Sequence, residues 1–192
     1  MELLEQRILR DGKVYPGNVL KIDSFLNHQV DVTFCGALAD EFVHLFGHGA
    51  TKVLTVEASG IVLACLVADR LGVPMVFAKK QKHSNVAGNM LSADVRSYTT
   101  DTVFTIAVCA DYITPQDKVL VIDDFLARGQ AAQGMIEIVR KGGATLVGCG
   151  FAVEKGFQPG GRELRESGIH VESLAIVEEM HPDGTIRFRK QG

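Results

Sequence analysis

The sequence has little net charge and no long apolar run. Its 20 Lys and Arg residues against 23 Asp and Glu residues leave a net charge of −3, which offers no general attraction for nucleic acid or an anionic membrane surface. No apolar stretch approaches the roughly 20 residues that a membrane-spanning helix needs. The first seven residues, MELLEQR, are too charged for a secretory signal peptide. These absences predict a cytoplasmic protein.

Cysteine is also scarce, and the few cysteines form no recognised pair. No C-x-x-C spacing occurs, so neither a disulfide framework nor a zinc site is supported. Each cysteine has apolar or small neighbours, which favours buried, reduced thiols that pack as small hydrophobes. This prediction covers Cys35, Cys65, Cys109 and Cys149.

Two histidines, His44 and His48, lie four residues apart, a spacing that can hold a metal ion on a helix. Gly47 and Gly49 interrupt that helix, however, and no acid or cysteine is placed to complete a ligand set. We therefore interpret both as surface histidines.

The middle of the chain alternates short apolar runs with helical patterns. Helices are predicted over 61–71 and 131–141, and strands over 53–56, 75–78, 104–108, 119–122 and 145–153. This alternation with short links is typical of an α/β domain with a mostly parallel sheet covered by helices. At 192 residues the chain fits one such domain. Ligands of these sheets bind beyond the carboxyl ends of the strands.

Two terminal segments, about 1–32 and 156–192, do not follow this alternation of strands and helices. We expect them to form together a small hood over the site. The polar segment 83–93, which contains Gly88 and two asparagines, is predicted to be a functional loop between two strands.

The most informative stretch is VLVIDDFLARGQAA, residues 119–132. It reads as a short apolar strand, two adjacent carboxylates (Asp123 and Asp124), a turn at Gly129 and the start of a helix. Adjacent acids usually lie in a solvated loop, but this context favours a site. Carboxylates suit sugar hydroxyls, and the unpaired N–H groups of a helix N-terminus suit a phosphate. The chain lacks both the triphosphate P-loop and the dinucleotide G-x-G-x-x-G pattern, so the predicted ligand is a sugar phosphate.

This stretch resembles the signature of the type I phosphoribosyltransferases, which bind 5-phosphoribosyl pyrophosphate (PRPP). The resemblance implies the fold of that family and transfer of the 5-phosphoribosyl group, with Mg²⁺ bound mainly through PRPP and pyrophosphate. It assigns the ribose hydroxyls to the catalytic acids Asp123 and Asp124. It assigns the 5′-phosphate to a phosphate cradle formed by Ala127, Arg128, Gly129, Gln130 and Ala131.

Two further segments match the family by position. The polar turn Glu57, Ala58, Ser59 and Gly60 follows a strand and opens a helix, as the family's pyrophosphate loop does; such a turn lets the backbone approach an anion. Lys79, Lys80 and Lys82 follow the next strand, where the family often places cations facing pyrophosphate, although a solvated basic cluster is the alternative. Residues 83–100, including Ser97 and Tyr98, match the mobile loop that covers the reaction.

Residues 19–29, 154–160 and 171–175 resemble the xanthine branch of the family. That resemblance implies that Leu20, Asn27 and Lys155 meet the purine. A Lys donor suits a 6-oxo group and disfavours a 6-amino group, and an amide at position 27 could address a second oxo group. The plainer alternatives are a turn residue for Asn27 and a solvated side chain for Lys155.

Two positions depart from the family pattern. Arg128 stands where relatives commonly carry Asn or Thr, and Ala127 stands where hypoxanthine–guanine enzymes place an acid for the purine N7 proton. Ala127 therefore argues against a straightforward hypoxanthine–guanine enzyme, although a guanine or hypoxanthine preference stays open. A PRPP-sensing regulator is a weaker alternative, because no DNA-binding segment is evident. The family resemblance also implies a homodimer.

Overall fold

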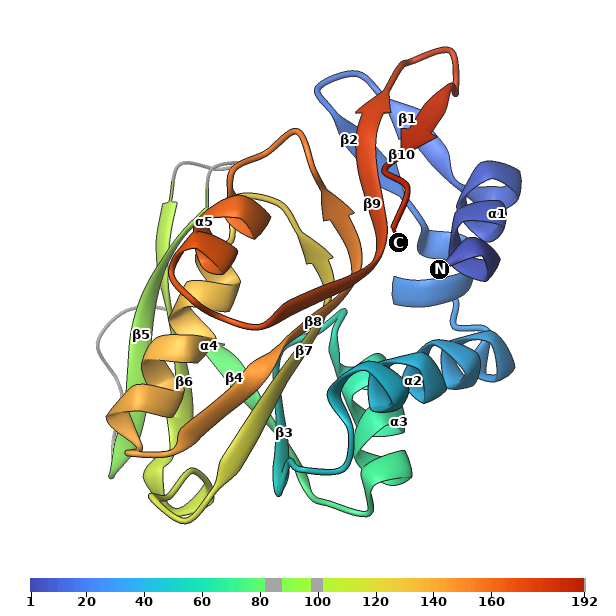
Figure 1. Ribbon diagram of the computed structural model, residues 1–192. Coiled ribbons are helices and arrows are strands. Elements are labelled where there is room, and N and C mark those ends of the chain that lie inside the picture. Colours follow the sequence, from blue (N-terminus) through green and yellow to red (C-terminus); the bar gives the residue numbers. More distant parts are fainter. Residues whose placement is uncertain (82–87, 98–101, 192) are drawn as a thin grey trace.

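The structure is a computed structural model that describes residues 1–81, 88–97 and 102–191 (Figure 1). Its main sheet has the strand order β10-β9-β8-β7-β3-β4-β6-β5. The five strands from β9 to β4 are parallel, and antiparallel strands flank them on both sides. The bounds are β3 (Lys52–Val56), β4 (Met75–Gln81), β5 (Met90–Ser97), β6 (Thr102–Cys109), β7 (Lys118–Leu126), β8 (Thr145–Lys155), β9 (Val171–Met180) and β10 (Ile186–Phe188). The prediction of an α/β domain with a mostly parallel sheet is confirmed.

Helices cover both faces of this sheet (Figure 1). Helices α2 (Val32–Phe46) and α3 (Ile61–Leu71) pack on one face, and α4 (Gln130–Lys141) and α5 (Gly160–Glu166) pack on the other. A short 3₁₀ turn, η2 (Ala110–Tyr112), precedes β7. No helix in the described part of the chain is long and apolar enough to cross a membrane.

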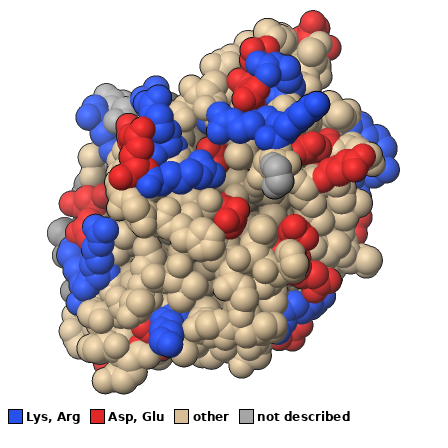
Figure 2. Space-filling model, viewed as in Figure 1, with Lys and Arg blue, Asp and Glu red and all other residues tan. Residues whose placement is uncertain are grey.

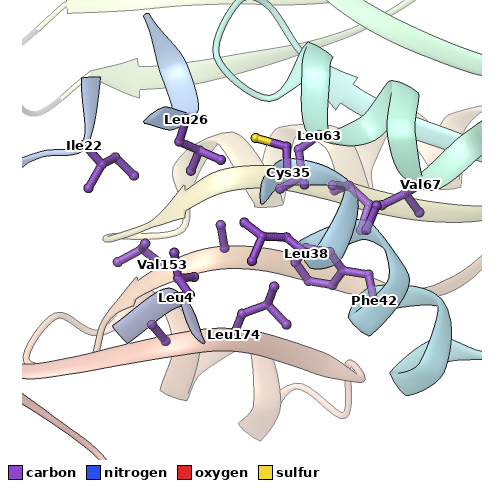
Figure 3. Close-up of a cluster of buried hydrophobic side chains, with 14 of the residues drawn as sticks. Leu4, Ile22, Leu26, Cys35, Leu38, Phe42, Leu63, Val67, Val153 and Leu174 are labelled. Carbon is purple, nitrogen blue, oxygen red and sulfur yellow. The ribbon is translucent and has the colours of Figure 1, made fainter. Parts of the chain in front are cut away.

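The core on the α2–α3 face joins elements that are far apart in the sequence (Figure 3). Leu38 and Phe42 of α2 are fully buried in one cluster with Val67 of α3 and Val153 of β8, and Leu174 of β9 is 2% exposed there. Burying a side chain of this size contributes about 1.5–3 kcal/mol. This core holds the two helices against the strands that carry the site.

The four cysteines are free thiols, and the prediction that all are buried is partly wrong. Cys35 and Cys149 are buried, whereas Cys109 is half-buried and Cys65 is exposed. In α3 the residues that face the core are Leu63, Ala64, Val67 and Ala68, so Cys65 lies on the outer surface of that helix. Burial raises the pKa of the Cys35 thiol to about 11.

The two terminal segments meet at β9. The first segment contains α1 (Glu2–Asp11), a hairpin of β1 (Lys13–Tyr15) and β2 (Val19–Lys21), and a π-helical turn, η1 (Asp23–Asn27). The Met1 amino group and the Gln191 side chain both donate hydrogen bonds to the Leu174 carbonyl oxygen, and the chain ends lie near each other in Figure 1. Their joint role as a hood stays a prediction.

The prediction of a continuous loop over 83–100 is wrong for Met90–Ser97. These residues form β5, which pairs with β6 along its whole length. Ala93 and Val95 are buried, while Asp94 and Arg96 are exposed, so the segment has the two-residue period of a strand. Residues 83–87 and 98–100, including Tyr98, lie outside the described residues.

Candidate active site

A cavity of about 610 Å³ opens at the edge of the sheet where the parallel strands end. The β1–β2 hairpin lies near this edge, at the top of Figure 1. The described residues that line the cavity come from the β1–β2 turn, three neighbouring strands, the β7–α4 connection and the end of β8. They are Gly17, Asn18, Val19, Lys80, Val95, Arg96, Phe104, residues 125–132, Lys155 and Gln158.

The adjacent acids Asp123 and Asp124 lie near the end of β7, next to the cavity-lining residues, and each is only 6% exposed. Asp124 Oδ2 accepts a hydrogen bond of 2.9 Å from the side chain of Asn27 in η1. Asp123 Oδ1 instead accepts the backbone N–H of Asp124 at 3.0 Å. Burial, followed by the neighbouring Asp124 charge, raises the pKa of Asp123 well above its ordinary value. The two carboxyl groups therefore have different environments.

The predicted pyrophosphate loop, Glu57–Gly60, packs directly against this acid pair. A Cβ atom on Gly60 would overlap both the Asp123 carboxylate and the Thr55 hydroxyl, so the close approach requires glycine. Glu57 Oε1 accepts the backbone N–H of Lys80 at 2.7 Å, which ties the loop to β4. The Glu57–Ala58 peptide bond is cis. The fold thus brings the second predicted loop to the acids of β7.

The phosphate cradle is an open helix N-terminus. Gly129 has φ +78°, a left-handed conformation that suits glycine, and it turns the chain from β7 into α4. No side chain caps α4, and its first turn contains no acid. The first N–H groups of a helix lack intrahelical acceptors, and residues 127–132 line the cavity. An anion such as a phosphate fits this position.

The start of α5 supports the cradle from behind. Gly160 donates its N–H to the Ala127 carbonyl oxygen at 3.1 Å. A Cβ atom on Gly160 would lie 2.5 Å from that oxygen and 2.6 Å from the Gly129 nitrogen. Because both neighbours are backbone atoms, the contact leaves no room for a side chain.

An ion pair between a half-buried guanidinium and a buried carboxylate holds α5 in this place. Arg165 of α5 donates two hydrogen bonds, of 2.9 and 2.7 Å, to Glu154 of β8, which also accepts one of 2.6 Å from the Ser173 hydroxyl. Burial alone would raise the pKa of Glu154, but the Arg165 and Ser173 hydrogen bonds hold it below its usual value. Charged side chains gather over α5 on the face shown in Figure 2. Removing Arg165 would leave the buried Glu154 carboxylate without its charged partner, so the pair anchors α5.

The other end of the cavity combines a cation with an aromatic ring. Lys155 Nζ lies 5.7 Å from the centroid of the Phe125 ring and donates a hydrogen bond of 2.8 Å to the Asn18 carbonyl oxygen. Burial lowers the pKa of Lys155 from its ordinary value. Gln158 lines the same end. This half-buried group offers a flat apolar surface beside hydrogen-bond donors.

The family model described as "Phosphoribosyl transferase domain" matches residues 22–166. The chain belongs to the phosphoribosyltransferase family. The resemblance seen in the signature at 119–132 is therefore confirmed. The role of the open first turn of α4 as the phosphate cradle stays a prediction.

Close relatives share nearly the whole length of this family member. The xanthine phosphoribosyltransferase of Lachnoclostridium phytofermentans is 49% identical, with 98% of each chain covered. That of Oceanobacillus iheyensis is 48% identical, covering all of this chain and 98% of the other. That of Bifidobacterium adolescentis is 50% identical, covering 98% of this chain and all of the other.

Solved structures of adenine phosphoribosyltransferases share the fold. The Trypanosoma brucei enzyme, in complex with AMP, pyrophosphate and ribose-5-phosphate, matches with a TM-score of 0.75 at 20% sequence identity. The match covers 90% of this chain and 78% of the chain of that enzyme. The Rhodothermus marinus enzyme has a TM-score of 0.73 at 24% identity and covers 91% of this chain and 98% of its own. The predicted type I phosphoribosyltransferase fold is confirmed.

The structure separates some of the residues that the family resemblance groups together. The strand predicted over 75–78 continues to Gln81, so Lys79 and Lys80 point to opposite faces of β4. Lys80 lines the cavity, whereas Lys79 lines a separate groove. Leu20 is 5% exposed and belongs to the core, and it is not among the described lining residues. The ligand contacts assigned to Lys79 and Leu20 stay predictions.

Phe125, Gln158 and Asn18 are among the lining residues of this phosphoribosyltransferase cavity that were assigned no role from the sequence. Phe125 lies inside the signature itself, and an aromatic residue directly after the two acids is the signal that could have revealed it. Gln158 belongs to the segment 154–160 that resembles the xanthine branch, but only its place in the cavity lining identifies it. Asn18 is a turn residue with no signal for a role in the site.

Proposed function

We propose that this protein transfers the 5-phosphoribosyl group of PRPP to xanthine, forming xanthosine monophosphate and releasing pyrophosphate. One observation carries this proposal: a single cavity joins the open first turn of α4 at one end to Lys155 at the other. The nearly full-length relatives with that activity support the choice of purine. A cytoplasmic location is part of the proposal, because the four cysteines are free thiols.

The phosphoribosyl half of the reaction belongs to the end of β7 and the start of α4. The cradle N–H groups bind the 5′-phosphate, and Asp124 exchanges its Asn27 contact for the ribose hydroxyls. The bond from ribose C1 to the pyrophosphate oxygen then breaks with both electrons going to that oxygen, a bond from C1 to a purine nitrogen forms, and the proton of that nitrogen is released to solvent. Ribose carries positive charge in between, and alignment of both partners can lower the barrier by roughly 7–11 kcal/mol.

The purine half of the reaction belongs to Phe125 and Lys155. The Phe125 ring, which is half-buried beside the cavity, offers a stacking surface for a planar base. Lys155 has donors only, so it suits the 6-oxo group of xanthine and leaves the 6-amino group of adenine without an acceptor. Gln158 can donate or accept a hydrogen bond, which suits a second substituent on the ring.

Magnesium is the expected metal of the reaction. No cluster of three or more His, Cys, Asp or Glu that could hold a metal occurs in the described ranges. Mg²⁺ prefers substrate phosphates and water over a cage of protein ligands. We propose that PRPP and pyrophosphate oxygens would hold the ion. When bound, the ion neutralises charge on the departing pyrophosphate.

A purine panel with PRPP tests the proposed function. Xanthine should give the highest kcat/KM, followed by guanine and hypoxanthine, and adenine should react at least about 100-fold more slowly because a buried donor would lack its acceptor. Preference for adenine would contradict the role of Lys155. A higher kcat/KM for guanine or hypoxanthine than for xanthine would favour the hypoxanthine–guanine branch of the family. Formation of no nucleotide from any purine would favour a PRPP-binding regulator.

We also propose that the protein is a homodimer that associates through the groove on the outer side of β4. The groove has a volume of about 530 Å³ and is lined largely by apolar residues, including Phe77 and Tyr112, which are 36% and 58% exposed. Lys79 and Asp111 line it too, and neither has an ion-pair partner among the described residues. If Lys79 of one copy faces Asp111 of the other, two-fold symmetry forms the same ion pair twice.

Size-exclusion chromatography with light scattering, which measures the molar mass in solution, tests this association. The wild type should have twice the mass of the chain, and Phe77→Asp should shift it towards the single-chain mass, because a charge would be buried without a partner. Leu9→Asp is the matched control, since Leu9 lies on α1 and is 56% exposed. A single-chain mass for the wild type would contradict the homodimer, and a Phe77→Asp variant that stays dimeric would contradict this surface.

A further inference from the structure

The contact between Lys155 and the β1–β2 turn joins two parts of the molecule that are far apart in the sequence. The Lys155 ammonium group donates a hydrogen bond of 2.8 Å to the backbone carbonyl oxygen of Asn18, at the tip of the hairpin. Lys155 is half-buried while Asn18 is exposed, and both line the cavity. An ammonium group has three N–H donors. One is used by Asn18, which leaves two, and the centroid of the Phe125 ring lies 5.7 Å from Nζ.

The backbone of the β1–β2 turn has a left-handed conformation. The three-residue connection between Tyr15 and Val19 contains two successive left-handed residues, Gly17 with φ +83° and Asn18 with φ +62°. Asn18 is the one described residue other than glycine that has a positive φ. Glycine and asparagine adopt this conformation readily, whereas a β-branched residue resists it. The direction of the Asn18 carbonyl therefore depends on a residue that tolerates φ near +60°.

From these contacts we infer that the Asn18 turn is a positioning and specificity-determining element for the purine. The inference rests on the proposed function and deepens it. The Asn18 carbonyl holds the Lys155 ammonium over the Phe125 ring, 5.7 Å from the ring centroid, so a base that binds beside this ring meets the two remaining N–H donors at a fixed position. Asn18 acts through its backbone, and its side chain is not needed.

Two substitutions separate the backbone of Asn18 from its side chain. Asn18→Gly removes the amide but keeps the left-handed turn, whereas Asn18→Val removes the amide and disfavours the turn. Asn18→Val should raise the KM of the purine at least about tenfold, the loss typical of a charge-assisted hydrogen bond, and leave the KM of PRPP within about twofold. Asn18→Gly should raise the KM of the purine clearly less than Asn18→Val does, because glycine keeps the left-handed turn. Circular dichroism of both variants verifies the fold.

A double-mutant cycle with Lys155→Ala completes the test. In the Lys155→Ala background, Asn18→Val should have no further effect on the purine KM, because the group that the carbonyl holds is gone. The inference is overturned if Asn18→Val and Asn18→Gly behave alike, if the KM of PRPP rises equally, or if the two effects multiply. The cycle uses the purine that the wild type converts best. A failure of the xanthine assignment therefore appears in the wild-type panel and is distinguishable from a failure of this inference.

Discussion

Asp124→Asn should lower kcat by about 100-fold, a loss typical of one misplaced or missing polar group at a reacting centre. Asparagine keeps the shape of the side chain and an oxygen that can accept the Asn27 hydrogen bond, so the fold and the hood contact should persist. What disappears is the negative charge near the ribose, where positive charge develops during transfer. Steady-state kinetics with saturating PRPP, together with a thermal unfolding midpoint close to that of the wild type, provide the measurement.

Asp123→Asn is the informative comparison for that variant. The buried Asp123 carboxyl has a raised pKa and accepts the Asp124 N–H, a bond that an amide oxygen can also accept. Its neutral replacement should therefore cost clearly less activity than Asp124→Asn. Equal losses in the two variants would show that the acids act as one unit, and unchanged kinetics in Asp124→Asn would remove its assigned role.

Gly160→Ala should lower kcat/KM for PRPP by about 100-fold, because a displacement of the phosphate cradle by as little as 1 Å can cost that much. The added methyl group would lie 2.5 Å from the Ala127 oxygen and 2.6 Å from the Gly129 nitrogen, so the cradle or α5 must move. Overpacking of this kind costs about 1–3 kcal/mol. Kinetics with PRPP and with the purine varied in turn should show the loss mainly for PRPP.

Gly49→Ala is the matched control for Gly160→Ala. A Cβ atom on Gly49 would have no neighbour within 4 Å, and its φ is not in the left-handed region. This variant should keep the kinetics of the wild type. If Gly160→Ala lowers the unfolding midpoint but keeps the PRPP kinetics, α5 stabilises the fold without positioning the cradle.

Much of the site follows from contiguous residues. The stretch at 119–132 combines an apolar strand, two acids, a left-handed glycine and an amphipathic helix, and each of these depends on residues that are neighbours in the chain. The same is true of the helix over 61–71, which the structure shows at those bounds. Local periodicity and turn chemistry suffice for such elements.

Other features lay beyond local patterns. The segment Met90–Ser97 contains polar residues and follows a glycine, so it resembles a loop until β6 is placed beside it to complete its hydrogen bonds. The division between Lys79 and Lys80 depends on β4 continuing past Ala78, where β6 replaces β3 as the partner that the last residues pair with. Cys65 has apolar neighbours in the chain, but helix rotation exposes it.

The sequence by itself determined the α/β alternation, the acid pair and the phosphate cradle, because these arise from residues a few positions apart. Only the tertiary structure decided which groups meet across long distances in the chain: Gly60 against Asp123, Gly160 against the cradle, and the Asn18 carbonyl at the Lys155 ammonium. Such contacts form when separate segments pack together, and no spacing in the sequence encodes them. For this protein the reacting groups are local, and their positioning is a property of the fold.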